Sequence, residues 1–99
     1  MRTKLSQKTM RLFNREARLF MRTTGTQIIT TEHYSDGYPA VSFTAIGSHK
    51  KSREVVQNTF LAQLREDGTP HHIFESSTGR RVWRDWDQIP DAKRQLELR

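Results

Sequence analysis

Hydrophobic positions in the first quarter of the chain recur at helical spacing. Apolar side chains such as Phe13 and Ala17 follow one another every three or four residues, with basic side chains between them. At about 100° per residue, the apolar side chains form one wide arc of a helix. Ser6 is a suitable N-cap and Gly25 a suitable stop. The pattern therefore predicts an amphipathic helix over residues 6–22.

The next segment has the pattern of a β-hairpin. Residues 26–34 are rich in β-branched and aromatic side chains, and residues 39–46 alternate between apolar and polar positions. Asp36-Gly37 between them is a strong signal for a two-residue hairpin turn. Such a turn predicts one shared face that carries Ile28, Thr30, Tyr34, Val41 and Phe43.

Helical spacing returns in the second half of the chain. Val56, Phe60 and Leu64 lie at intervals of four residues, which is typical of one apolar helix face. Gly68 and then Pro70 follow, the usual order after a helix end. The pattern predicts a second helix that begins at Ser48 or Ser52 and ends near residue 66.

The remaining residues predict a second hairpin, because His72–Glu75 leads into a Ser- and Gly-containing turn and Arg80–Trp86 returns. The 99 residues, 33% of them hydrophobic, suffice for a single small domain with a modest core. We expect an α+β fold, with an antiparallel sheet packed on helices. Its expected order is a basic helix (1–25), a first hairpin (26–47), a second helix (48–68), a second hairpin (69–89) and a short helix or tail (90–99).

The net charge is concentrated at one end of the chain. Lys and Arg number 17 against 11 Asp and Glu, which gives a net charge of +6. Residues 1–25 contain seven basic residues and one acid, Glu16, so they account for the whole excess. Six of these cations fall within roughly 80° of arc on the predicted helix. We name this set the basic ridge; it consists of Lys4, Lys8, Arg11, Arg15, Arg18 and Arg22.

A row of cations is typical of proteins that bind nucleic acid, because neutralising successive phosphates releases condensed counterions. Like charges three or four residues apart destabilise a helix, so a partner, or acids such as Glu32, Asp85 and Asp87, should offset the repulsion. The ridge predicts a small non-enzymatic protein that contacts the phosphate backbone of DNA or RNA. Loss of one ridge arginine should then weaken binding to all sequences alike.

Other interpretations of the basic ridge stay open. As a regulator or inhibitor, the protein would dock the ridge on an acidic protein surface. A basic amphipathic N-terminus is also typical of a mitochondrial targeting segment or of a helix on an anionic membrane surface. No apolar run approaches the roughly 18 residues of a membrane span, and we expect a cytoplasmic protein. A homodimer would enlarge the modest core.

Two further clusters carry basic side chains. The segment Arg80–Arg84 places an aromatic side chain among cations, the combination that stacks on bases and contacts the backbone of a nucleic acid. The alternative is that the tryptophans close the hydrophobic core. The second cluster is a lysine pair after residue 49. We expect the two clusters to extend the footprint of the ridge through Lys50, Lys51, Arg80, Arg81, Trp83 and Arg84.

The segment around the lysine pair resembles parts of two RNA-directed families. From Tyr34 through Gly47-Ser48-His49-Lys50-Lys51 into the predicted helix, it resembles the end of a double-stranded-RNA-binding domain, where a lysine pair opens the last helix and contacts phosphates. Gly47-Ser48-His49 is also similar to the Gly-Ser-His of small RNA-cleaving toxins of the HicA type. The double-stranded-RNA-binding fold has three strands between its helices, whereas residues 26–47 supply two strands. The resemblance implies Lys50 and Lys51 as phosphate contacts.

The sequence shows no motif for catalysis or metal binding. The chain has no cysteine, which excludes disulfides and Cys-ligated zinc. His71 and His72 are adjacent, so in a strand they would point to opposite faces, and His33 and His49 have no ligand-type partner at a suitable spacing. The acids and histidines of the second hairpin match no catalytic spacing. We expect no metal, no cofactor and no enzymatic activity, with nuclease-like chemistry as the alternative.

Overall fold

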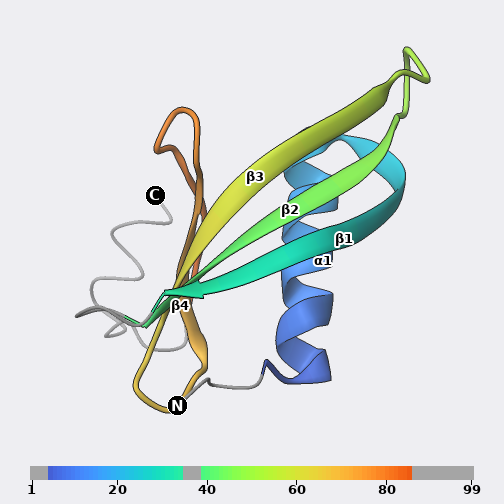
Figure 1. The fold of residues 1–99 in the computed structure, drawn as a ribbon. Helices are drawn as coiled ribbons and strands as arrows, with labels where there is room; N and C mark the ends of the chain where they lie inside the picture. The colour runs from blue at the N-terminus through green and yellow to red at the C-terminus, as the bar shows by residue number, and fades with distance from the viewer. Residues whose placement is uncertain (1–4, 35–38, 86–99) are drawn as a thin grey trace, which may run out of the picture.

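One helix followed by five strands forms the part of the protein that the structure describes, residues 5–34 and 39–85 of a computed structural model. The elements are α1 (Gln7–Met21), β1 (Thr23–Tyr34), β2 (Ala40–His49), β3 (Val55–Leu64), β4 (Pro70–Glu75) and β5 (Arg81–Arg84). The strands form one antiparallel sheet in the order β1-β2-β3-β4-β5. The helix lies against one face of this sheet (Figure 1).

The helix α1 forms where the sequence predicts it. The Ser6 hydroxyl oxygen accepts a hydrogen bond from the Thr9 backbone N–H at 3.1 Å, which confirms Ser6 as the N-cap. The helix ends at Met21 because Arg22 adopts a left-handed conformation, with φ 56° and ψ 48°. The Lys50 backbone N–H donates to the Arg22 carbonyl at 3.0 Å. The turn between β2 and β3 is thereby attached to the C-terminal end of α1.

The predicted second helix is wrong, because Val55–Leu64 forms β3. An interval of four residues is even, so it places Val56, Phe60 and Leu64 on one face of a strand as well as of a helix. Burial in β3 follows a period of two, because residues 60, 62 and 64 are buried and the residues between them are partly exposed. The expected order of helix, hairpin, helix, hairpin and short helix is therefore wrong. Residues 90–99, expected as a short helix or tail, lie outside the described residues.

The first hairpin forms with a different register from the predicted one. Ile28 lies on the face of Val41 and Phe43 as expected, whereas Thr30 lies on the other face. Tyr34 pairs with residue 40, one position later than a two-residue turn at residues 36–37 would give. A shift of one residue moves side chains to the opposite face, and an irregularity between residues 28 and 30 restores the expected face for Ile28.

The core lies between α1 and the sheet and is built around three stacked phenylalanines. The ring centroid of Phe43 is 4.4 Å from that of Phe13 on α1 and 5.1 Å from that of Phe60 on β3. All three side chains are fully buried. Trp83 on β5 is one of the partly buried side chains that pack against the hydrophobic core. The aromatic stack therefore fixes the position of the helix on the sheet.

Gly47 in β2 marks the closest approach of β2 to the start of β1. A Cβ atom at this position would lie 2.8 Å from the Thr23 Cβ and 2.9 Å from the Thr26 hydroxyl oxygen. Thr23 is fully buried, and its hydroxyl lies 2.7 Å from that of Thr26. We expect Gly47→Ala to lower the free energy of unfolding by about 1–3 kcal/mol, because a packed side chain must be displaced. Urea denaturation followed by circular dichroism measures this; an unchanged midpoint would show that β1 moves aside freely.

Candidate nucleic-acid interface

The basic ridge forms a row along the side of α1 that faces away from the sheet. The helix buries Thr9, Phe13, Ala17 and Met21, and at about 100° per residue the ridge positions lie opposite these four. Lys4 lies outside the described residues. The other five ridge residues are all exposed: Lys8, Arg11, Arg15, Arg18 and Arg22.

One ion pair neutralises part of the charge of the ridge, because Arg15 pairs with Glu16 at 3.0 Å. Asp85, one of the acids expected to offset the repulsion, pairs with Arg65 at 2.8 Å. Glu32, a second of these acids, lies in β1, where it pairs with Ser42 of β2. Asp87, the third, lies outside the described residues. The exposed ridge residues thus form a row of cations along α1, with Glu16 paired to one of them.

The turn between β2 and β3 continues the ridge past the end of α1. Lys50 and Lys51 are exposed, and the hydrogen bond from Lys50 to Arg22 holds this turn at the helix end. His49 Nδ1 accepts the backbone N–H groups of Lys51 and Ser52 at 3.2 and 3.3 Å. His49, which the sequence predicts near the start of a helix, thus stabilises the turn between two strands. The lysine pair, expected to extend the footprint of the ridge, thus follows directly on Arg22.

One cation of this turn was not among the predicted site residues. Arg53 is exposed and adopts a left-handed φ of 67°. Its backbone N–H donates to the His49 carbonyl at 2.9 Å. Arg53 lies two residues after Lys51 in the sequence, but the prediction of a helix through this segment gave no reason to group the two. The turn therefore carries three cations.

The structure divides the predicted cluster of β5 between the two faces of the sheet. Trp83 pairs with Ile73, whose buried side chain faces α1. Arg84 pairs with His72 and Arg81 with Phe74, at positions that alternate with Ile73 and so belong to the face away from α1. Arg80 is exposed in the preceding turn. Of the three residues of this cluster in β5, Trp83 therefore lies on the face towards α1, and Trp86 lies outside the described residues.

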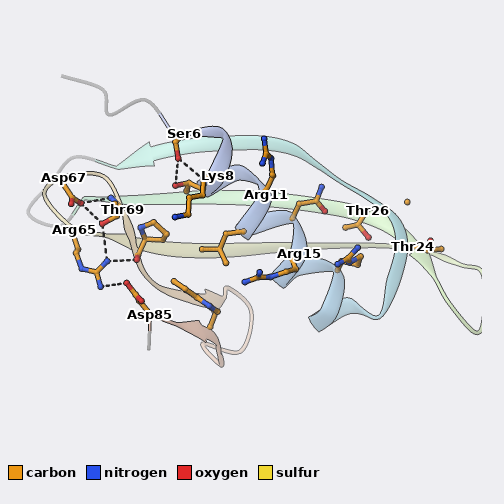
Figure 2. A pocket seen from close by; sticks show the side chains of 17 residues that line it. Ser6, Lys8, Arg11, Arg15, Thr24, Thr26, Arg65, Asp67, Thr69 and Asp85 are labelled. Carbon is orange, nitrogen blue, oxygen red and sulfur yellow. Dashed lines mark hydrogen bonds and ion pairs between the residues drawn. The ribbon is translucent and has the colours of Figure 1, made fainter. Parts of the chain in front are cut away.

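A groove of about 1180 Å³ lies alongside α1. Its helix side is lined by Lys8, Leu12 and Arg15, and its strand side includes Pro70 and Trp83. Figure 2 shows Lys8, Arg11 and Arg15 following one another along the helix, with Arg65, Asp67 and Thr69 beside the end that carries Lys8. The groove brings together residues from α1, β1, β5 and this loop, which the sequence alone did not group.

The carboxylates of the groove are held at one end of it. Asp67 accepts hydrogen bonds from the Thr69 hydroxyl at 2.6 Å and from the Thr69 backbone N–H at 2.9 Å. These bonds lower the pKa of Asp67, the hydroxyl contributing most. Asp85 pairs with Arg65, which also donates to the Pro70 carbonyl at 2.9 Å. Figure 2 shows Arg65, Asp67 and Asp85 together at this end. The helix side is therefore the part of the groove suited to an anion.

The histidines of β4 lie closer together than their adjacent positions predict. The ring centroids of His71 and His72 are 4.1 Å apart, so the expectation that they point to opposite faces is wrong. An irregularity in the pairing of β3 with the start of β4 accompanies this arrangement. Among residues 5–34 and 39–85, no group of three or more His, Asp or Glu side chains is arranged to hold a metal ion.

Protonation of His72 is expected to destabilise the fold. Burial lowers the pKa of His72 below its ordinary value of 6.5, and the neighbouring His71, Arg84, Arg81 and Arg65 act in the same direction. Below about pH 6.5 the unfolded chain therefore binds this proton more strongly than the folded protein does. Stability should be complete above that pH and fall as the pH drops towards the folded-state pKa.

The effect of His72 can be isolated with one substitution. We expect the urea midpoint of the wild-type protein to fall between about pH 7.5 and pH 5.5, and that of His72→Gln to fall less. Subtracting the fall in the urea midpoint of one protein from that of the other cancels the contribution of the titrating groups that both share. Equal falls in both proteins would contradict the prediction.

Comparison with protein families, with curated proteins and with solved structures gives no match for this chain. The resemblance to double-stranded-RNA-binding domains also fails, because β3 follows Lys51 where that fold has a helix. The described part of the chain has no helix with the length and hydropathy needed to cross a membrane. The described part of the protein is therefore classed by its architecture, a five-stranded antiparallel sheet that carries one basic helix.

Proposed function

We propose that the protein binds nucleic acid, without enzymatic activity, through contacts with the phosphate backbone. The contact surface is the basic ridge together with the turn that carries Lys50, Lys51 and Arg53. One observation carries the proposal: four exposed cations lie in line on the side of α1 opposite its buried face, the exposed Arg22 follows at the helix end, and the turn that carries Lys50 is attached to Arg22.

The length of the ridge suits a phosphate backbone. At a rise of about 1.5 Å per residue, the helix advances roughly 21 Å from Lys8 to Arg22. One strand of a nucleic acid presents about six phosphates over that distance, at roughly 3.4 Å per phosphate along a duplex axis. Four cations from the helix, Arg22 at its end and three from the turn therefore provide a comparable number of contacts.

Helix stability does not explain this arrangement of charge. Successive ridge residues lie three or four positions apart, and four such like-charge pairs destabilise the helix by about 1–2 kcal/mol in total. Lys8 lies in the first turn, which contains no acidic residue, although the helix dipole favours acids there. Arg18 and Arg22 alone lie at the end where the dipole favours cations. An external polyanion would offset the repulsion along the whole row.

The ridge is suited to affinity rather than to sequence recognition. Phosphate contacts fix position and orientation, whereas base edges specify sequence. The exposed side of α1 carries Lys and Arg at its ridge positions, and these side chains reach phosphates of any sequence. We therefore expect similar affinities for unrelated sequences of the same strand type.

Fluorescence anisotropy at two salt concentrations tests the proposal. We expect the affinity for duplex DNA, single-stranded DNA or duplex RNA to fall by about 100- to 1,000-fold between about 50 and 200 mM salt, as five or so phosphate contacts require. Absence of binding to all three at the lower concentration would refute it. Binding that hardly responds to salt would also contradict it, and capture of one acidic protein at fixed stoichiometry would favour the regulator interpretation.

A further inference from the structure

We infer that the groove beside α1 binds a single-stranded nucleic acid, with a base stacked on Trp83 and phosphates on Lys8 and Arg15. This inference rests on the proposed function and adds the strand type and the residue that recognises it. Single-strand binding generally combines a basic track for the backbone with an aromatic side chain for the bases. The groove provides both within one surface.

Trp83 is positioned as a fixed stacking platform. Its side chain is half-buried, packs against the hydrophobic core and also lines the groove. The pairing of Trp83 with Ile73 holds its backbone in the sheet. A base that stacks on an indole already held in place loses little additional side-chain entropy on binding. A tryptophan buried wholly in the core would have no surface to offer.

The composition of the two walls matches the two parts of a nucleotide chain. Lys8 and Arg15 line the helix side, where phosphates would lie. Leu12, Pro70 and Trp83 add apolar surface to the groove, on which the flat face of a base can lie without losing hydrogen bonds. The two carboxylates are confined to one end by their bonds with Thr69 and Arg65. A polyanion would therefore follow the helix and avoid that end.

The shape of the bases in each strand type decides which of them the groove can take. The volume of about 1180 Å³ is close to the upper end of the roughly 300–1,000 Å³ of a usual ligand site, so the groove has room for a nucleotide. Duplex bases are stacked on each other and cannot lay a face on Trp83, whereas the bases of a single strand can. The groove therefore distinguishes strand types, although the ridge alone would bind either.

Tryptophan fluorescence tests the stacking directly. The chain contains two tryptophans, so Trp86→Phe leaves Trp83 as the only tryptophan, excited selectively at the red edge of the absorption band, and does not alter the groove residue. We expect a single-stranded oligothymidine to quench this emission with the same concentration dependence as the anisotropy change, and a duplex of equal length to leave it nearly unchanged. Binding of the single strand without quenching would overturn the inference.

Two substitutions at position 83 provide the affinity test. Trp83→Leu keeps an apolar side chain without an aromatic face, and Trp83→Phe keeps a smaller face. We expect the leucine variant to bind the single strand about tenfold or more weakly, the phenylalanine variant to lose less, and both to keep their duplex affinity. Circular dichroism confirms folding of each variant.

The outcomes separate this inference from the proposed function. If single strand and duplex bind equally well and the leucine variant retains both affinities, the groove inference fails while the proposed function stands. If no nucleic acid binds to the wild-type protein at about 50 mM salt, both fail.

Discussion

Replacing Phe43 with alanine is expected to lower the free energy of unfolding by about 3–5 kcal/mol. The Phe43 side chain is fully buried, and its ring stacks between those of Phe13 and Phe60. Its removal leaves a cavity at the point where α1 meets the sheet, and both neighbouring rings lose a partner. A domain of this size has about 5–15 kcal/mol of stability in total, so the variant should lose a large fraction of it.

Urea denaturation followed by circular dichroism measures this loss, and an exposed apolar residue supplies the control. Leu19 on α1 is 58% exposed, so Leu19→Ala should change the free energy of unfolding by less than about 0.5 kcal/mol. A loss below about 1 kcal/mol in the Phe43 variant would show that the three-ring stack does not hold the helix on the sheet.

The double substitution Arg11→Gln with Arg18→Gln is expected to weaken binding to duplex DNA by about 100-fold at about 50 mM salt. The slope of log affinity against log salt should decrease by about two, because two phosphate contacts are lost. Both residues are exposed, and neither is the arginine that pairs with Glu16. The substitution therefore removes ridge charge without leaving an internal acid unpaired.

A control variant with the same change in net charge decides whether position matters. Arg80→Gln with Arg81→Gln also removes two exposed arginines, from a turn and a strand outside the proposed contact surface. We expect this variant to keep its affinity within about threefold of the wild-type protein, since only distant screened charge is lost. Equal losses in the two variants would show that overall charge, rather than the ridge, determines binding.

The sequence predicts those features that depend on neighbouring residues. The helix α1 has its own cap in Ser6 and a three- to four-residue period that no strand would show. The positions of the ridge follow from that period, so the sequence gives both the helix and its charged side. In Val55–Leu64, by contrast, apolar residues at intervals of four fit either a helix or a strand. The segment forms a strand because it pairs with β2 over almost its whole length.

The groove depends on contacts between distant parts of the chain, which no local pattern reveals. Trp83 reaches the ridge because β5 lies at the end of a five-stranded sheet that also carries α1. Lys50 reaches the helix end through its hydrogen bond to Arg22. The sequence predicts a helix at Arg65, and a helix there would not bring its side chain to Pro70 and Asp85. The two bonds follow from the strand that forms instead.

The order of the strands also leaves two edges in the described sheet. In the described sheet, β1 and β5 each have one neighbouring strand, and an edge strand with free backbone groups is a template on which further copies can add and aggregate. The strand β5 is four residues long with an arginine at each end, and the pairing of β1 is interrupted by two irregularities. Short length, positive charge and bulges are the usual defences of such edges. Arg81 and Arg84 are thus placed where their charge would oppose the addition of another strand to β5.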